Sequence, residues 1–533
     1  MNKRSIATVS ISGALDEKLK AIAAAGFDTV EIFENDLVAF GARPREIGQM
    51  CRDLGLSICA YQPFRDFEGM PEPQRARTFV RAERKFDLMQ ELGTDLLLIC
   101  SSVSPASLGG IDRAAADFHE LGERAAKRGL RVGYEALAWG RHVHDYRDAW
   151  EIVRRADHKA IGVILDSFHA LAPALPTNAI RAIPADKIFL VQLADAPKLE
   201  LDVLSWSRHF RSFPGQGDLP VGEFMEAVAA TGYAGPLSLE IFNDQFRAGS
   251  APRTALDGMR SLLLLQDDLA GKMPAASEPR FEPRVRSHGI GFVEFAVSED
   301  KAEPLARLFG QLGFRKSGRH RSKAVQRWSQ GAIELVINCE PASFAHSHYV
   351  THGPGVCALA LDVDSADRAM ARAQALKTRT FTQPVGPGEL EIPAIHGVGG
   401  SLLYFLDAKG KNWDVDFEAV ASDEGNDRLV AVDHIVQSMP HEEMLSWLLF
   451  YAGLIDFSRL PQMEIADPRG LVQSQAIVNG DRSLRFILNG SSATRTMSSR
   501  FISEFFGSGV QHIAFSCDDI FAAVAEMRAR GAG

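Results

Sequence analysis

The first half of the chain repeats one pattern of apolar and polar positions. A short apolar run ends in polar residues, and a segment with helical periodicity follows, usually closed by a glycine. Runs bounded in this way are typical of strands buried on both faces, and strand–helix alternation predicts a parallel sheet. The eight runs are 6–11, 29–33, 57–64, 95–100, 131–139, 161–169, 188–196 and 236–242. Eight such units predict an α/β fold of the (β/α)8 barrel type, which typically takes about 250 residues.

A doubly wound open sheet is the alternative to the barrel. Such a sheet would usually have fewer strands, and it would carry a phosphate-binding glycine loop after its first strand. The segment SISGAL (10–15) does not have the GxGxxG spacing of that loop. The pattern therefore favours the barrel.

Polar side chains stand where several of these strands should end, which is where a barrel collects its chemistry. Burying a carboxylate in an apolar run is costly unless it is paired or bound to a metal. Taken alone, each could be a strand-end residue paired with an arginine or exposed at the mouth. Together, three carboxylates and one carboxamide from consecutive strands predict a site for Mg²⁺, Mn²⁺, Co²⁺ or a similar divalent ion. The residues are Glu135, Asp166, Gln192 and Glu240, with Glu31 at the end of the second strand.

Several motifs of this half resemble a known family. They are, in order, GFDTVEIFEND, YEALAWGRHV, LDSFH, VQLADAP, SRHFRSFPGQGDLP and LSLEIFND. Over residues 1 to 265 the chain resembles the sugar-phosphate-isomerase-like TIM-barrel superfamily, and within it the bacterial 3-dehydroshikimate dehydratases of quinate and shikimate catabolism. The resemblance implies a metal-dependent hydro-lyase that forms protocatechuate through a metal-stabilised enolate, with Glu135, Asp166, Gln192 and Glu240 as metal ligands.

The chain departs from parts of that superfamily. Many members have histidine where Gln192 stands, and a glutamine also suits hydroxypyruvate isomerases. Leu137 and Ala194 stand where another dehydratase branch has His and Lys. A sugar or hydroxypyruvate-type isomerase on the same barrel therefore remains an alternative.

Other polar residues are candidates for catalysis and substrate binding. His169 lies three residues beyond Asp166 and is the candidate general acid/base, because histidine titrates in the required range. A structural histidine is the alternative. A substrate carboxylate favours an arginine that can donate two parallel hydrogen bonds. Arg211 ranks first because it precedes a Pro- and Gly-rich turn; Arg65, Arg208, Ser207, Glu31 and Trp139 are further candidates for the pocket.

After the barrel the pattern breaks and a second architecture follows. Prolines and charges over 267–286 predict an interdomain linker. Segments 289–297 and 302–314 then resemble 428–436 and 442–457, and 353–376 resembles 507–531. These duplicated βαβββ units resemble the α+β vicinal-oxygen-chelate fold and 4-hydroxyphenylpyruvate dioxygenase. The predicted domains are the barrel (1–266), a first dioxygenase-like copy (287–420) and a second copy (428–533).

In the dioxygenase family two histidines and one carboxylate hold Fe²⁺. His434 and His512 match the two histidines in the second copy, whereas Glu294 and Ala358 are aligned with them in the first. The family's third ligand lies on a later strand, so the last repeat is expected to be incomplete and the iron site vestigial. An Fe²⁺ dioxygenase acting on an aromatic 2-oxo acid is the rival function.

Composition narrows the class of protein. The 533 residues carry 58 Lys and Arg against 68 Asp and Glu, a net charge of −10, which argues against nucleic acid as a partner and against an endonuclease on this barrel. Six scattered cysteines and the lack of an apolar run of roughly 18 residues favour a cytoplasmic enzyme with a small-molecule substrate and no membrane contact. A homo-oligomer, with the second half as an oligomerisation module, remains open.

Overall fold

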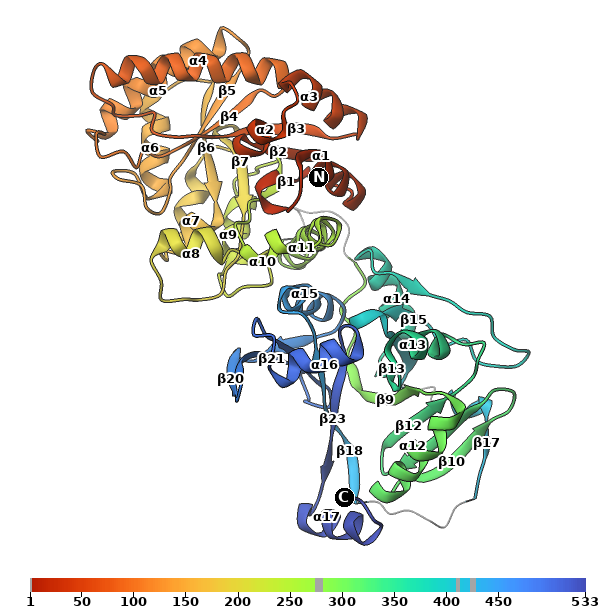
Figure 1. The fold of residues 1–533 in the computed structure, drawn as a ribbon. Coiled ribbons are helices and arrows are strands. Elements are labelled where there is room, and N and C mark those ends of the chain that lie inside the picture. Colours follow the sequence, from red (N-terminus) through yellow and green to blue (C-terminus); the bar gives the residue numbers. More distant parts are fainter. Residues whose placement is uncertain (1, 274–280, 409–412, 422–427) are drawn as a thin grey trace. The chain divides into compact units, whose positions relative to one another are not determined.

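The computed structural model describes residues 2–273, 281–408, 413–421 and 428–533 (Figure 1). The chain divides into two compact units, Met1–Arg280 and Phe281–Gly533.

The first unit is a closed barrel of eight parallel strands that pair in chain order, with β1 also paired to β8. This confirms the predicted fold class. All residues of β2, β4, β6 and β7 are buried, as expected of strands covered on both faces. The strands are β1 (Arg4–Ala7), β2 (Thr29–Phe33), β3 (Ser57–Phe64), β4 (Leu96–Cys100), β5 (Arg131–Glu135), β6 (Ile161–Asp166), β7 (Ile188–Leu193) and β8 (Leu237–Leu239).

Helices on the outside of the barrel connect these strands, as Figure 1 shows for α4, α5 and α6. Local sequence sets their ends: the Asp145 side chain caps α6, and Gly93 takes a left-handed conformation after α4. The helices are α1 (Leu15–Ala25), α2 (Glu34–Phe40), α3 (Pro44–Asp53), α4 (Gln74–Leu92), α5 (Ile111–Ala126), α6 (Tyr146–Ala156), α7 (Ser167–Leu171), α8 (Val203–His209), α9 (Val221–Ala229), α10 (Asp244–Ala248) and α11 (Ala251–Lys272), with short 3-10 turns η1 (Thr8–Ser10), η2 (Thr177–Ala182) and η3 (Ala185–Lys187).

Helix α11 corrects the start of the predicted linker. It runs to Lys272, six residues past position 266, because Leu269 and Ala270 continue its buried apolar face. Residues 274–280 of the linker lie outside the described residues. Val285 already pairs with Ile455 inside the second unit.

The second unit contains two mixed sheets, which confirms the predicted dioxygenase-like architecture. The first copy forms a nine-stranded sheet in the order β14-β15-β16-β13-β9-β12-β11-β10-β17. Its strands are β9 (Ser287–Ala296), β10 (Arg315–His320), β11 (Val325–Gln330), β12 (Ile333–Asn338), β13 (Gly355–Val363), β14 (Thr380–Phe381), β15 (Ala394–His396), β16 (Leu402–Asp407) and β17 (Phe417–Ala419). Its helical segments are α12 (Glu299–Leu312), α13 (Phe344–His352), α14 (Ala366–Ala375), η5 (Val398–Gly400) and η6 (Trp413–Asp416).

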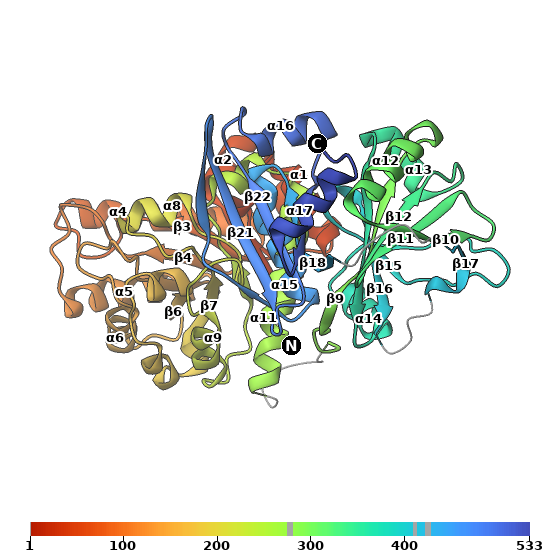
Figure 2. The same cartoon turned by 90° about the horizontal axis from the view of Figure 1, so that it is seen from below.

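The second copy forms a sheet in the order β19-β21-β22-β18-β23, with β20 paired to β21. Figure 2 shows β21, β22 and β18 lying side by side. The strands are β18 (Leu429–Ser438), β19 (Phe457–Arg459), β20 (Met463–Asp467), β21 (Gly470–Asn479), β22 (Arg485–Gly490) and β23 (Gly509–Cys517). The helical segments are η7 (His441–Glu443), α15 (Met444–Leu454), α16 (Met497–Phe505) and α17 (Ile520–Ala529).

The registers of the two sheets correct one detail of the sequence alignment. Phe292, and not Glu294, occupies the position of His434, whereas Ala358 does correspond to His512. The pairs that establish this are Phe292–Ala360 and Glu294–Ala358 in the first sheet, and His434–Ala514 and Val436–His512 in the second. The register shifts of the two strand pairs fall at equivalent positions, so the pairs match residue for residue and Phe292 takes the place of His434.

Two further observations bear on the class of protein. Among the helices of the described residues, none combines the length and the apolar character needed to cross a bilayer. All six cysteines are free thiols.

Candidate metal centre and active site

The four predicted metal ligands meet at the C-terminal end of the barrel. Glu135 and Asp166 are the last residues of β5 and β6, Gln192 is the penultimate residue of β7, and Glu240 directly follows β8. All four are buried. Their strands are neighbours in the barrel, and the register places Asp166 directly beside Gln192. The structure therefore brings together all four residues that the sequence predicted.

Two of these side chains have oxygens without a hydrogen-bond partner among the described residues. They are Oε1 of Glu135 and Oε1 of Gln192, and both atoms are buried. Leaving a buried polar atom unpaired costs free energy, so such atoms point to a ligand that is not protein. Carboxylate and amide oxygens are the ligands that hard divalent cations prefer. The donor set thus fits a divalent metal ion.

A second carboxylate, that of Asp166, lies close to Glu135. One ligand atom each from Glu135, Asp166 and His169 lie within 4.8 Å of one another, the spacing expected of groups around one ion. The Cys100 thiol donates to Oε2 of Glu135 at 3.3 Å, which leaves the other oxygen of that carboxylate available. Backbone N–H groups of Phe168 and His169 fix Oδ1 of Asp166.

Arg211 lies among these carboxylates and is almost fully buried, with 1% of its surface exposed. Its Nη1 donates to Oδ2 of Asp166 at 2.8 Å and to Oε2 of Glu240 at 3.1 Å. The Ser207 hydroxyl accepts from both its Nε and its Nη2. Arg211, the first-ranked candidate for a substrate carboxylate, is therefore held by two predicted metal ligands, and Ser207 holds Arg211 in place.

Burial and crowding shift the acidity of these groups. Burial, together with the carboxylates of Glu240 and Asp166, raises the pKa of Glu135 well above its usual value. Burial also raises the pKa of Glu240. Burial opposes ionisation of Asp166 too, but the Arg211 guanidinium outweighs it and holds the pKa of Asp166 below its usual value. One guanidinium thus compensates only part of the negative charge, which again fits a bound cation.

His169 lies beside this cluster with a hydrogen-bond donor facing each ring nitrogen. The Ala138 N–H donates to Nδ1 at 3.1 Å, and Nη2 of Arg211 lies 3.1 Å from Nε2. Burial, with Arg211 opposing protonation, lowers the pKa of His169 to about 3. The imidazole is therefore neutral, and because Nδ1 accepts from the Ala138 N–H, its single ring proton lies on Nε2. Its ring also packs against Trp139, with 5.0 Å between ring centroids.

Glu31 lies deeper in the barrel and orients the predicted ligand Gln192. Nε2 of Gln192 donates to Oε2 of Glu31 at 2.9 Å, and this turns the amide oxygen to the other side. Burial and the nearby Glu240 raise the pKa of Glu31 to about 8. Gln62 of β3 donates to Glu240 at 2.9 Å and lies 3.4 Å from Glu31. Sequence reasoning missed Gln62, although a polar residue in the apolar run 57–64 is the same signal that pointed to the predicted metal ligands.

Arg65 and Arg208 differ from Arg211 in having no ion pair among the described residues. The Arg208 guanidinium stacks over the rings of Phe242 and Trp139, 4.6 and 5.8 Å from their centroids. Burial and the neighbouring Arg65 cation lower its pKa. Two close guanidinium groups without a carboxylate partner form a place for an anion.

The loop that carries Arg211 is fixed by Asp195, three residues after Gln192. The Asp195 carboxylate accepts from four backbone N–H groups, those of Ala196, Gly215, Gly217 and Leu219. Its backbone also pairs with Ser212. At Gly217 a Cβ atom would lie 2.3 Å from Oδ1 of Asp195, so only glycine fits there.

In the second unit, β18 and β23 bring the two predicted iron ligands together. The ring centroids of His434 and His512 lie 5.8 Å apart. Nδ1 of His434 lies 2.6 Å from the carboxylate of Asp433, which leaves Nε2 as the nitrogen available to a ligand. Among the described residues, no third His, Cys, Asp or Glu completes a metal-ligand cluster with the pair.

Comparison with known proteins supports the division of the chain. Residues 19–264 match the family described as xylose isomerase-like TIM barrel, 281–418 the N-terminal family of hydroxyphenylpyruvate dioxygenase, and 431–533 the glyoxalase/bleomycin resistance protein/dioxygenase superfamily. A 3-dehydroshikimate dehydratase of Pseudomonas putida is 49% identical over 99% of this chain and 85% of its own length. This chain belongs to that dehydratase family.

Two other relatives illustrate the fusion that this family carries. A solved xylose isomerase-like TIM barrel/4-hydroxyphenylpyruvate dioxygenase fusion protein is 49% identical, with a TM-score of 0.91, over 99% of this chain and 86% of its own. A 4-hydroxyphenylpyruvate dioxygenase of Pseudomonas aeruginosa is 34% identical over 46% of this chain and 71% of its own length. The resemblance drawn from the sequence motifs is thereby confirmed.

Proposed function

We propose that this chain dehydrates 3-dehydroshikimate to protocatechuate at the C-terminal end of its barrel. The observation that carries the proposal is the 49% identity to a 3-dehydroshikimate dehydratase along nearly the whole chain. The convergence of Glu135, Asp166, Gln192 and Glu240 on four neighbouring strands supports it. Mg²⁺, Mn²⁺ and Co²⁺ are the ions we propose for this site.

A divalent ion held there would act as a Lewis acid and stabilise negative charge on the substrate's carbonyl oxygen when the neighbouring proton is removed. The protein's own groups perform the other tasks. His169, whose neutral imidazole lies beside Glu135 and Asp166, is the proposed general acid/base for the α-proton. Loss of that proton and of the hydroxide from the β-carbon releases one water, and tautomerisation of the resulting dienone gives the aromatic ring.

Arg65 and Arg208 are the proposed binding groups for the substrate carboxylate. They lie near each other without a partner carboxylate, whereas Arg211 is already bound to Asp166 and Glu240. We therefore assign Arg211 to positioning the two acidic ligands, with Ser207 supporting it. The apolar cluster of Ala7, Val9, Phe33 and Phe242 offers a surface for the substrate ring.

The test is direct. Metal-loaded full-length protein is mixed with 3-dehydroshikimate, and the ultraviolet absorbance of protocatechuate is followed. Product should form with Mg²⁺, Mn²⁺ or Co²⁺, and a chelator should stop the reaction. A protein that binds the metal but forms no product would overturn the proposal. Glu226→Gln, which removes a surface carboxylate on α9 paired with Lys272, is the matched control for variants of the centre.

A further inference from the structure

The first dioxygenase-like copy contains a cavity of about 390 Å³ that the barrel reaction does not use. It is lined by residues of this copy alone, between positions 292 and 417. Ligand pockets typically measure about 300–1,000 Å³, so this volume suits a molecule of one or two rings. A binding site of its own is therefore sterically possible here.

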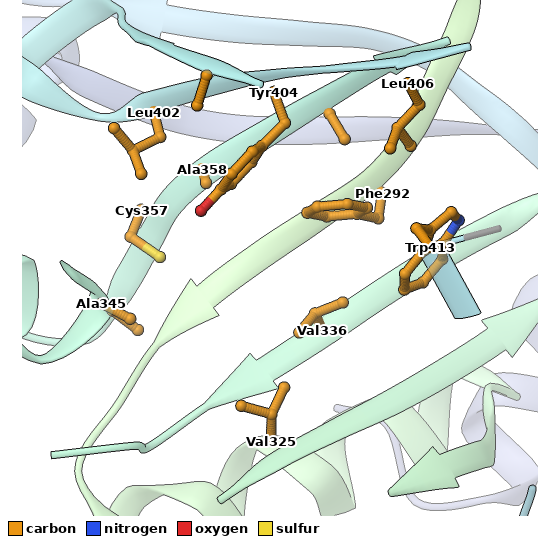
Figure 3. Close-up of a cluster of buried hydrophobic side chains, with 13 residues drawn as sticks. Phe292, Val325, Val336, Ala345, Cys357, Ala358, Leu402, Tyr404, Leu406 and Trp413 are labelled. Atoms are coloured by element: carbon orange, nitrogen blue, oxygen red, sulfur yellow. The ribbon is translucent and has the colours of Figure 1, made fainter. Parts of the chain in front are cut away.

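Six aromatic side chains line this cavity. Phe292, Tyr404 and Trp413 belong to one buried cluster, with 5.8 Å between the centroids of Phe292 and Tyr404 and 4.9 Å between those of Phe292 and Trp413. In Figure 3 the Phe292 ring lies between the other two. Phe344, Phe381 and Phe417 also line the cavity. Such walls favour a flat aromatic molecule, because rings pack edge-to-face or offset against one another.

Two polar groups within these walls have unused hydrogen-bonding capacity. Nδ2 of Asn338 donates to Oε1 of Glu294 at 2.6 Å, and the other carboxylate oxygen has no partner among the described residues. The Tyr404 hydroxyl likewise makes no hydrogen bond within the described chain, and it is close enough to Glu294 for the carboxylate to raise its pKa, after burial itself. One group can accept and the other can donate, which matches both hydrogen-bonding roles of a ligand hydroxyl.

The charges around the cavity argue against an anionic ligand. Lys323 is a cation on its lining, but its Nζ is already paired with Glu389 at 2.6 Å. Glu391 and Asp416 add further negative charge to the lining. A phosphate or carboxylate would meet repulsion there, whereas an uncharged phenol would not.

The strand registers explain why this cavity differs from the metal face of the second copy. Phe292 and Ala358 stand where the second copy has His434 and His512. An aromatic ring and a methyl group there take the places of the two imidazoles of the second copy. The face of the first copy that is equivalent to the one with the two histidines therefore suits an organic molecule.

We propose that this cavity binds a small, uncharged aromatic compound with at least one hydroxyl group, which donates to Glu294 and accepts from Tyr404. The site is independent of the function proposed for the barrel. A hydroxyl group on the aromatic compound should increase its affinity for the cavity, whereas a carboxylate should not.

The full-length protein is titrated separately with phenol, catechol, toluene, benzoate and protocatechuate. Binding is measured by calorimetry and by the change in Trp413 fluorescence. Subtracting the signal of Trp413→Phe isolates the response of this cavity from that of the barrel. Catechol and phenol should bind at least tenfold more tightly than toluene, and benzoate should not bind. Equal affinity for toluene, or tighter binding of benzoate or protocatechuate than of phenol, would overturn the proposal.

Two variants test the polar contacts. Tyr404→Phe removes only a hydroxyl that makes no internal hydrogen bond, so it should fold normally and weaken phenol binding severalfold. Tyr349→Phe is the matched control, because Tyr349 packs on the same aromatic cluster but does not line the cavity. Ala345→Leu should fill the cavity and abolish binding. Unchanged phenol affinity in Tyr404→Phe would refute the assigned contact even if Ala345→Leu failed to fold.

Discussion

The barrel centre and the cavity of the first dioxygenase-like copy differ in the number and the surroundings of their buried carboxyl groups. The barrel gathers Glu31, Glu135, Asp166 and Glu240 around one fully buried guanidinium, that of Arg211. The cavity holds a single deeply placed carboxyl, Glu294, among six aromatic rings. Crowded carboxylates with too few cations indicate a metal site, whereas one carboxyl in aromatic surroundings indicates an organic ligand.

The largest difference in effect should come from replacing one glutamate by glutamine at the barrel centre and one in the cavity. Glu135→Gln removes a proposed metal ligand, and we expect turnover of 3-dehydroshikimate to fall at least about a hundredfold. Glu294→Gln should leave turnover unchanged, because Glu294 belongs to the other unit. Protocatechuate formation and bound metal are measured for both variants. An equal loss of turnover in both variants would contradict the assignment of the reaction to the barrel centre alone.

The next largest effect should come from Arg65 and Arg208, the two arginines near the barrel centre that have no ion pair among the described residues. Arg208→Leu or Arg65→Leu removes a proposed carboxylate-binding group, so KM should rise roughly 10- to 100-fold with a smaller change in kcat, as expected for a charged hydrogen bond. Arg154→Leu, on the surface of α6, is the control. A fall in kcat at constant KM would show instead that these residues do not bind the substrate's ground state.

The Glu135 carboxylate should stabilise the metal-bound protein but destabilise the metal-free protein. Without metal, charge at Glu135 is unfavourable, since burial and neighbouring carboxylates raise its pKa. Glu135→Gln should therefore raise the free energy of unfolding of the metal-free protein by about 1 kcal/mol or more. Adding metal should raise the melting temperature of the original protein but much less that of the variant. Calorimetric melting with and without a chelator measures both, and a destabilised metal-free variant would contradict the charge argument.

The smallest effect should follow from loosening Arg211. Ser207→Ala removes the hydroxyl that accepts from its Nε and Nη2, and we expect kcat to fall about tenfold, as for one or two lost hydrogen bonds. Ser205→Ala, an exposed position on the same helix α8, should have no effect. Steady-state kinetics on both variants decide this, and identical kcat values would remove Ser207 from the positioning role.

The sequence predicted the barrel and its four convergent ligands because buried parallel strands leave their polar residues at one end. It could not reveal that Arg211 is held by Asp166 and Glu240, since those contacts join a loop to strands up to 45 residues away. The alignment of Glu294 with His434 failed because the sequence of β9 does not fix its register against β18, whereas the pairing of each strand with β13 or β23 does. The role of Gln62 was accessible from its place in an apolar run but needs the fold to show its partners.

The four backbone hydrogen bonds to Asp195 have a consequence for how such a site can diversify. They secure residues 215–219 directly behind the loop, and the pairing of Asp195 with Ser212 secures the position next to Arg211. The intervening stretch 198–209, which carries Arg208, is thus fastened at both ends independently of its own composition. Side chains of this stretch other than Ser207, which holds Arg211, can change while the acidic centre stays intact, so substrate preference can evolve separately from the chemistry.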